Sequence, residues 1–174
     1  MTKPKKLVLC KGFPGSGKST LARLIYEKNE WDNSVIHSTD DFHIRLIVEK
    51  NLDGSIRHEW KYIFDGSKLG EYHFRNLCEA ISSMTNSVSL VIIDNTNVTF
   101  KELKKYCVAA ITLGYEIELV EPNTEWKYNI EECAKRNTHG VSLEVIQKMR
   151  DRWESSESCY TKIEFLRKTL EEIK

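Results

Sequence analysis

The sequence of 174 residues has no net charge and no long apolar run. Its 26 Lys and Arg residues balance 26 Asp and Glu residues, whereas proteins that coat nucleic-acid duplexes normally carry excess cations. No apolar stretch approaches the roughly 20 residues of a transmembrane helix, and no signal-peptide pattern precedes the first apolar segment. Composition therefore argues against a duplex-coating or membrane protein. A few local cations would still be enough to bind the end of a nucleic-acid strand.

Paired cysteines are also missing. The five cysteines are odd in number and widely separated, and none forms a C-x-x-C pair. This spacing predicts neither a zinc site nor a disulfide framework. We therefore expect an intracellular protein, cytoplasmic or nuclear, in a reducing compartment.

Residues 12–19, Gly-Phe-Pro-Gly-Ser-Gly-Lys-Ser, match the phosphate-binding loop (P-loop) pattern G-x-x-x-x-G-K-[ST] at every fixed position. An apolar strand-like run precedes them, and apolar residues at helical spacing follow. In such a loop Lys18 reaches the β- and γ-phosphates and Ser19 ligates Mg²⁺. The sequence thus predicts a nucleoside triphosphate and Mg²⁺ as cofactors. The expected nucleotide-binding residues are Gly12, Pro14, Gly15, Ser16, Gly17, Lys18, Ser19 and Thr20.

Strand-like and helix-like segments alternate along the chain. Strands are expected at residues 7–10, 34–37, 88–93 and 115–120. Beyond the helix that follows the P-loop, helices are expected at residues 67–83, 99–113, 124–137, 142–153 and 161–174. This alternation predicts an α/β fold, a parallel sheet of about four strands with helices on both faces. We expect a single domain over residues 1–174, with its core at about 6–153.

The segment between residues 44 and 66 is polar, with interspersed aromatics and a turn signal at Asp53-Gly54, and it is expected to form a flap. Its aromatic residues could stack on a nucleobase or pack the flap onto the body, and packing is the favoured interpretation. These residues, with one from the next helix, are Trp60, Tyr62, Phe64 and Tyr72.

Two polar clusters follow the second and third expected strands, where parallel sheets bind ligands. Asp40, at the tip of the second strand, is the candidate general base, since phosphoryl transfer to a hydroxyl needs a group that takes its proton. Asp41 is expected to cap the following helix or to be a structural partner. Asp94 ends the third strand as a second metal-supporting carboxylate would.

Four motifs together resemble the P-loop kinases of the 5′-hydroxyl polynucleotide kinase group, most closely the kinase domains of animal ubiquitin-ligase-binding proteins. They are Gly12-Phe-Pro-Gly-Ser-Gly-Lys-Ser-Thr20, Ser38-Thr-Asp-Asp-Phe42, Ile92-Ile-Asp-Asn-Thr-Asn97 and Lys135-Arg-Asn-Thr-His-Gly140. The resemblance spans roughly residues 6–153 and implies a four-stranded parallel sheet, a helical lid, ATP and Mg²⁺, with a 5′-hydroxyl end of RNA or DNA as acceptor. It places the base on Asp40 and the lid arginine on Arg136.

Two departures from the family weaken the acceptor assignment more than the ATP assignment. The phage member has an arginine three residues after its base, where this chain has His43, and Arg45 is the nearest substitute. The third cluster reads Asp-Asn-Thr-Asn here, so its carboxylate has moved by one position.

The leading hypothesis is an ATP-dependent kinase of single-stranded 5′-hydroxyl ends, with Lys18, Asp40 and Arg136 as catalytic residues and Ser19 and Asp94 on the metal side. A small-molecule kinase and a catalytically silent nucleotide-binding adaptor remain the alternatives. The sequence leaves open RNA against DNA, ATP against GTP, the oligomeric state and protein partners.

Overall fold

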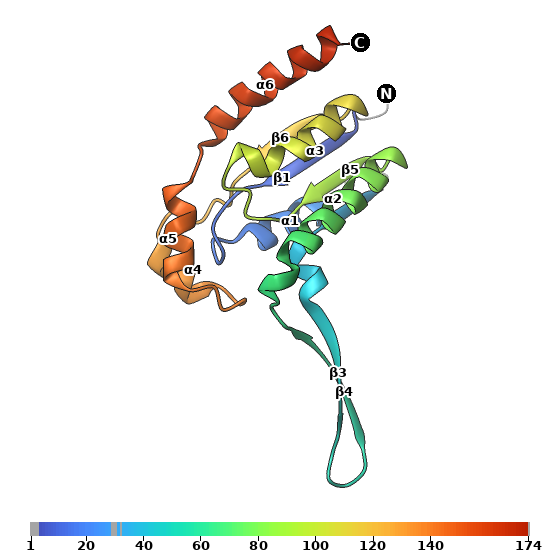
Figure 1. Ribbon diagram of the computed structural model, residues 1–174, viewed down its shortest axis with the longest axis vertical. Helices are drawn as coiled ribbons and strands as arrows, with labels where there is room; N and C mark the ends of the chain where they lie inside the picture. Colours follow the sequence, from blue (N-terminus) through green and yellow to red (C-terminus); the bar gives the residue numbers. More distant parts are fainter. Residues whose placement is uncertain (1–3, 29–30, 32, 174) are drawn as a thin grey trace.

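Four parallel strands form the sheet of the computed structural model, which describes residues 4–28, 31 and 33–173 (Figure 1). All three strand pairs in the sheet are parallel. Its spatial order is β2 (Ser34–His37), β5 (Leu90–Ile93), β1 (Lys6–Cys10) and β6 (Glu116–Val120). The α/β fold with four parallel strands is therefore confirmed, and β6 is the edge strand that its alternating pattern predicts.

The central strand β1 sends alternate side chains to two apolar layers. Leu7 and Leu9 enter one layer, whereas Val8 and Cys10 enter the other with helix α1 (Lys18–Glu27). The first layer is completed by α2 (Leu69–Thr85), α3 (Phe100–Thr112) and α6 (Ser156–Glu172). Period-two alternation thus buries both faces of the sheet.

The helical lid consists of α4 (Ile130–Arg136) and α5 (Leu143–Asp151), which lie beside the carboxyl ends of the strands (Figure 1). Its small core joins Ile130 and Ile146 to Phe13 of the P-loop. The lid therefore packs directly on the phosphate-binding region.

The flap is a β-hairpin, an element that was not among those expected. After a 3₁₀ turn η1 (Thr39–His43), strands β3 (Ile44–Lys50) and β4 (Ile56–Tyr62) form an antiparallel hairpin that projects from the body (Figure 1). Among the described strands these two pair only with each other, so most of their side chains are exposed. Their side chains nevertheless alternate in polarity, most regularly in β4, as is typical of strands. The turn at Asp53-Gly54 is confirmed, with Gly54 at a φ of 84°.

Several helix bounds also differ from expectation. The helix expected at 124–137 begins only at Ile130, and residues 125–128 form turns instead. The helix expected at 161–174 begins at Ser156, because Ser155 accepts a capping hydrogen bond from the Ser158 amide; residue 174 lies outside the described residues. A second 3₁₀ turn, η2 (Gly66–Lys68), precedes α2. None of the described helices is long and apolar enough to cross a membrane.

Candidate active site

The P-loop adopts a conformation that requires glycine. Gly12, Gly15 and Gly17 have φ values of 154°, 77° and 101°. A Cβ atom on Gly15 would lie 2.1 Å from the carbonyl oxygen of Cys133 in α4. Any side chain there would push the lid away, so the glycine permits both the loop conformation and its contact with the lid.

Lys18 lies at the start of α1 with only 8% of its surface exposed. Its Nζ donates to the carbonyl of Phe13 at 2.8 Å. Burial lowers the pKa of Lys18, whereas the nearby carboxylates of Asp94 and Asp40 raise it. The Oγ of Ser16 is likewise buried and has no partner among the described residues. The loop therefore presents a cation and an unpaired hydroxyl in a site suited to an anion.

Two side chains from the turns before α4 hold the P-loop backbone. Thr124 Oγ1 donates to the Ser16 carbonyl at 2.9 Å, and Trp126 Nε1 donates to the Gly15 carbonyl at 3.2 Å. In a trans peptide the N–H points opposite to the C=O, so these contacts turn the following N–H groups away from the lid residues. Neither contact with the P-loop is among the predictions from the sequence, because both residues fall within the helix expected at 124–137.

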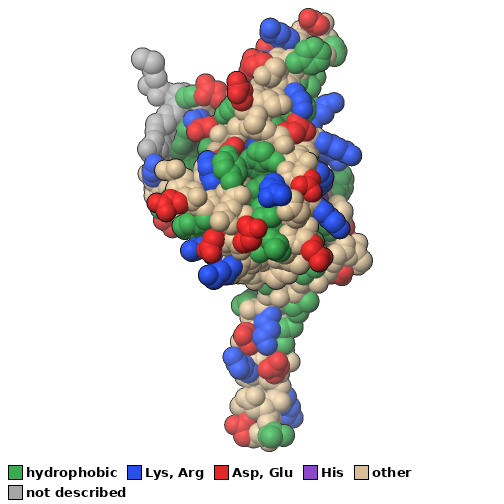
Figure 2. Space-filling view, turned by 90° about the vertical axis from the view of Figure 1, so that its left-hand side faces the viewer, with side chains coloured by type: hydrophobic (Ala, Val, Ile, Leu, Met, Phe, Trp, Pro, Cys, Tyr) green, Lys and Arg blue, Asp and Glu red, His purple; other side chains and the backbone are tan. Residues whose placement is uncertain are grey.

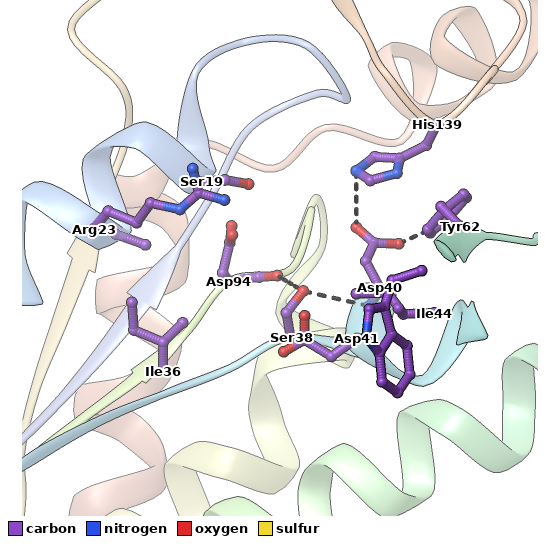
Figure 3. A pocket seen from close by; sticks show the side chains of 12 residues that line it. Ser19, Arg23, Ile36, Ser38, Asp40, Asp41, Ile44, Tyr62, Asp94 and His139 are labelled. Atoms are coloured by element: carbon purple, nitrogen blue, oxygen red, sulfur yellow. Dashed lines mark hydrogen bonds and ion pairs between the residues drawn. The ribbon is translucent and has the colours of Figure 1, made fainter. Parts of the chain in front are cut away.

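The predicted polar clusters meet at the carboxyl edge of the sheet, around a pocket of about 460 Å³ (Figure 3). Its walls come from α1, β2, η1, the hairpin, the end of β5 and the lid. The lining residues are Ser19, Ala22, Arg23, Ile36, Ser38, Asp40, Asp41, Ile44, Trp60, Tyr62, Asp94 and His139. Three expected site residues, Ser19, Asp40 and Asp94, are therefore brought to one pocket.

Asp94 has the character of a metal-supporting carboxylate. It is 9% exposed, and its Oδ1 is buried without a hydrogen-bond partner among the described residues. Figure 3 shows Asp94 and Ser19 on the same side of the pocket. Mg²⁺ in kinases is usually bound through one or two carboxylates and the substrate phosphates, so these two oxygen groups fit it. The described residues contain no cluster of three or more His, Cys, Asp or Glu side chains that could hold a metal without such phosphates.

Asp40 is held from two sides by residues that the sequence analysis did not assign to it. The Tyr62 hydroxyl of the hairpin donates to Oδ1 at 3.1 Å, and His139 Nε2 of the lid lies 3.6 Å from Oδ2 (Figure 3). Burial and the Asp40 carboxylate raise the pKa of Tyr62, which keeps it a hydrogen-bond donor. The base candidate therefore sits where the hairpin and the lid meet.

The expectation that Asp41 caps a helix is wrong. Ser38 is the N-cap of η1, and its Oγ accepts from the Asp40 amide at 3.3 Å. Partial burial, with the Asp40 and Asp94 carboxylates, raises the pKa of Asp41, whereas Arg23 lowers it. Arg23 thus supplies a cation at the pocket that the sequence analysis overlooked.

His43 and Arg45 do not occupy the position expected of an acceptor-side arginine. His43 is 1% exposed, and its ring packs among the rings of Tyr62, Phe64 and Tyr72. The Arg45 guanidinium donates to the Phe42 and Ile44 carbonyls and to the Tyr72 hydroxyl. Both residues anchor the base of the hairpin, and neither lines the pocket.

The flap aromatics divide into two groups. Tyr72 is buried against Phe42, as the packing interpretation predicts. Trp60 is 69% exposed, so packing is the wrong interpretation for it, whereas Phe64 is 57% exposed but keeps its ring centre 5.0 Å from that of His43. Trp60 in addition lines the pocket.

Arg136 lies at the end of α4, outside the residues that line the pocket. Its guanidinium carbon is 4.1 Å from the ring centre of Trp126, and its Nε donates to Glu132 Oε2 at 3.0 Å. Since Trp126 also bonds the P-loop, the lid arginine and the loop share one supporting side chain. The arginine therefore lies close to the P-loop while it remains half-exposed.

Comparison with known proteins supports this arrangement. A family model described as an AAA domain matches residues 7–155. Human NEDD4-binding protein 2 is 39% identical over 148 residues, which cover 85% of this chain and 8% of that protein. The chain thus spans only a small part of this relative.

Solved structures share the fold. A chain of the Pnkp1/Rnl/Hen1 RNA repair complex has 21% identity and a TM-score of 0.58, over 93% of this chain and 46% of that chain. A gluconokinase from Sinorhizobium meliloti 1021 has 15% identity and a TM-score of 0.52, over 89% and 78%. The family resemblance indicated by the four motifs is confirmed: the chain belongs to the AAA domain family, in the branch with a P-loop kinase fold.

Proposed function

We propose that this chain is a polynucleotide kinase, which transfers the γ-phosphate of ATP to the 5′-hydroxyl end of single-stranded RNA or DNA and requires Mg²⁺. The observation that carries the proposal is the composition of the pocket. Ser19 of the P-loop motif and the carboxylate of Asp40 line the same cavity. A phosphate donor on the loop and a hydroxyl beside Asp40 would therefore face each other.

Each residue has a role in this proposal. The P-loop and Lys18 bind the triphosphate, and Arg136 neutralises charge on the transferring group. Asp40 takes the proton of the acceptor hydroxyl. The oxygen of that hydroxyl bonds to the γ-phosphorus as the bond between the γ-phosphorus and the leaving ADP breaks. Tyr62 and His139 orient the Asp40 carboxylate. Ser19 and Asp94 would hold Mg²⁺, which when bound neutralises phosphate charge and orients the triphosphate.

A small-molecule kinase is the second candidate, and the pocket favours it in one respect. A cavity of about 460 Å³ lies within the range of small-ligand sites. The fold also occurs in a protein named gluconokinase. A silent nucleotide-binding adaptor is the third candidate, and the intact P-loop, Asp40 and Arg136 argue against it.

One experiment separates the three candidates. ATP labelled at the γ-phosphate is incubated with the protein, Mg²⁺ and either 5′-hydroxyl RNA or DNA oligomers or a panel of nucleosides and sugars. We expect label on the oligomers. Label on a small alcohol alone would favour the second candidate, and nucleotide binding without transfer to any acceptor would favour the third.

A further inference from the structure

The projecting hairpin has two chemically different faces. Successive side chains of a strand point to opposite faces, so the strand register sorts them. The first face carries the cross-strand pairs Ile44/Tyr62, Leu46/Trp60, Val48/His58 and Lys50/Ile56. The second face carries Arg45/Lys61, Ile47/Glu59 and Glu49/Arg57. Both strand glutamates therefore lie on the second face.

The charged side chains of the second face form ion pairs with one another. Glu59 pairs with Arg57 and with Lys61, each at 3.3 Å, and Lys61 lies 3.7 Å from Glu49. The strand residues of the first face include no carboxylate, and Lys50 and His58 are its only cationic or titratable nitrogen groups. No strand carboxylate therefore repels a phosphate group on the first face, whereas two carboxylates lie on the second.

The first face is apolar, exposed and continuous with the pocket. Trp60 is 69% exposed, Val48 57% and Leu46 44%. Ile44, Trp60 and Tyr62 of this face also line the pocket, where Tyr62 bonds Asp40. Figure 2 shows the hairpin projecting away from the body. A strand end whose hydroxyl reaches Asp40 can therefore continue along this face.

The geometry points to the first face of the hairpin as the binding site for the bases that follow the 5′-terminal nucleotide, with Trp60 as the stacking platform. The inference rests on the proposed function and names the part of the acceptor that the hairpin recognises. Unpaired bases offer flat apolar rings, and single strands are bound by stacking these rings on aromatic side chains beside cations that contact the backbone. Duplex bases are stacked internally, so the site selects single strands.

The test compares Trp60→Ala, Trp60→Phe and the matched second-face control Arg57→Ala. Acceptors are a 5′-hydroxyl DNA hexamer, the same hexamer with abasic sites after its first nucleotide, and a nucleoside 3′-monophosphate. We expect Trp60→Ala to raise the KM for the hexamer about 5- to 150-fold, the factor of one lost stacked base. The kcat and the KM for ATP should stay within about threefold, and Trp60→Phe and Arg57→Ala should resemble the wild type.

The abasic hexamer isolates the contact. With the abasic hexamer, the KM of the wild-type protein should rise by the same factor by which Trp60→Ala raises the KM for the normal hexamer. The KM of Trp60→Ala should not rise further with the abasic hexamer. With the nucleoside 3′-monophosphate, wild type and Trp60→Ala should differ far less in KM than they do with the normal hexamer. Equal KM values of wild type and Trp60→Ala for the normal hexamer would overturn this inference and leave the proposed function standing.

Two further outcomes would overturn the inference for different reasons. If the wild type phosphorylates no oligomer, the proposed function fails first, and the inference with it. If sedimentation velocity shows a wild-type dimer that Trp60→Ala dissociates, the face binds a second copy of the chain and the inference is overturned.

Discussion

Lys18 illustrates how a single residue can be prepared for a ligand. Its ammonium is almost fully buried and donates a hydrogen bond to the backbone carbonyl of Phe13. Burying a charge is costly unless it is paired and hydrogen-bonded, and here the nearby Asp94 and Asp40 offset part of that cost. A bound triphosphate would supply the remaining negative charge, which is why this side chain is expected to contribute to binding and turnover.

Replacing Lys18 with Ala should lower kcat by about 10²–10³, because one preorganised contact to developing charge is removed. Nucleotide affinity should also fall. The measurement is γ-phosphate transfer beside nucleotide titration, with circular dichroism to verify folding. A folded Lys18→Ala protein with near-normal activity would contradict the role of the loop.

Replacing Asp40 with Asn should slow transfer by about 10²–10⁴ and leave ATP affinity within a few-fold. Asparagine keeps the shape but loses the basic oxygen. The matched control is Asp41→Asn, in the same turn and pocket, because it is Asp40 that contacts Tyr62 and His139. If Asp41→Asn were the inactive variant, the assignment within the pair would be reversed.

At the scale of elements, the lid and the P-loop behave as one unit. Thr124 and Trp126 bond loop carbonyls, and the Gly15 backbone approaches that of Cys133 so closely that no Cβ fits between them. Arg136 stacks on the same Trp126. Movement of the lid would therefore be transmitted to the loop that binds phosphate.

Gly15→Ala tests this close approach. A residue other than glycine in the left-handed region costs about 1–2 kcal/mol. Gly114 has a φ of 73° and open space around its Cβ position, so Gly114→Ala should lower the free energy of unfolding by only that amount. Gly15→Ala should cost more and should also weaken nucleotide binding, because the added methyl group collides with α4. Thermal unfolding measures the loss of stability, and nucleotide titration measures the loss of affinity. An equal loss of stability in Gly15→Ala and Gly114→Ala would contradict the coupling between the loop and α4.

Arg136→Ala should lower turnover by about 10³–10⁵ if the side chain meets charge in the transition state, with a far smaller change in ATP affinity. Arg136→Lys should rescue poorly, because lysine lacks the planar guanidinium. Lys135→Ala is the matched control, since Lys135 pairs with the same Glu132 and is 77% exposed. A fully active Arg136→Lys enzyme would reduce the arginine to a surface charge.

At the scale of the whole molecule, sheet topology gathers the site. The P-loop follows β1, Asp40 follows β2 and Asp94 follows β5, and parallel pairing brings these strand ends to one edge. Tyr62 of the hairpin and His139 of the lid then contact the two carboxylate oxygens of Asp40. The chain as a whole carries no excess of cations.

Salt should therefore weaken oligomer binding only modestly. With two or three phosphate contacts and a slope of about −0.7 per contact on a single strand, affinity should fall about 7- to 18-fold between 50 and 200 mM salt. The measurement is oligomer binding by fluorescence anisotropy across that range. A loss of 10³ or more would indicate a far more extensive phosphate interface than the pocket and hairpin provide.

The sequence by itself determined the P-loop, the four parallel strands and the meeting of Asp40 with Asp94. These follow from local rules, since apolar periodicity reports burial and the glycine pattern reports a backbone conformation. Only the tertiary structure decided the contacts of Trp126, His139 and Tyr62 and the two faces of the hairpin. Such contacts join segments distant in the chain, so they depend on strand register and on the placement of the lid. The alternation of apolar or aromatic and charged residues over 56–62 is typical of a strand, but it does not show that the hairpin pairs with no other described strand and stays exposed on both faces.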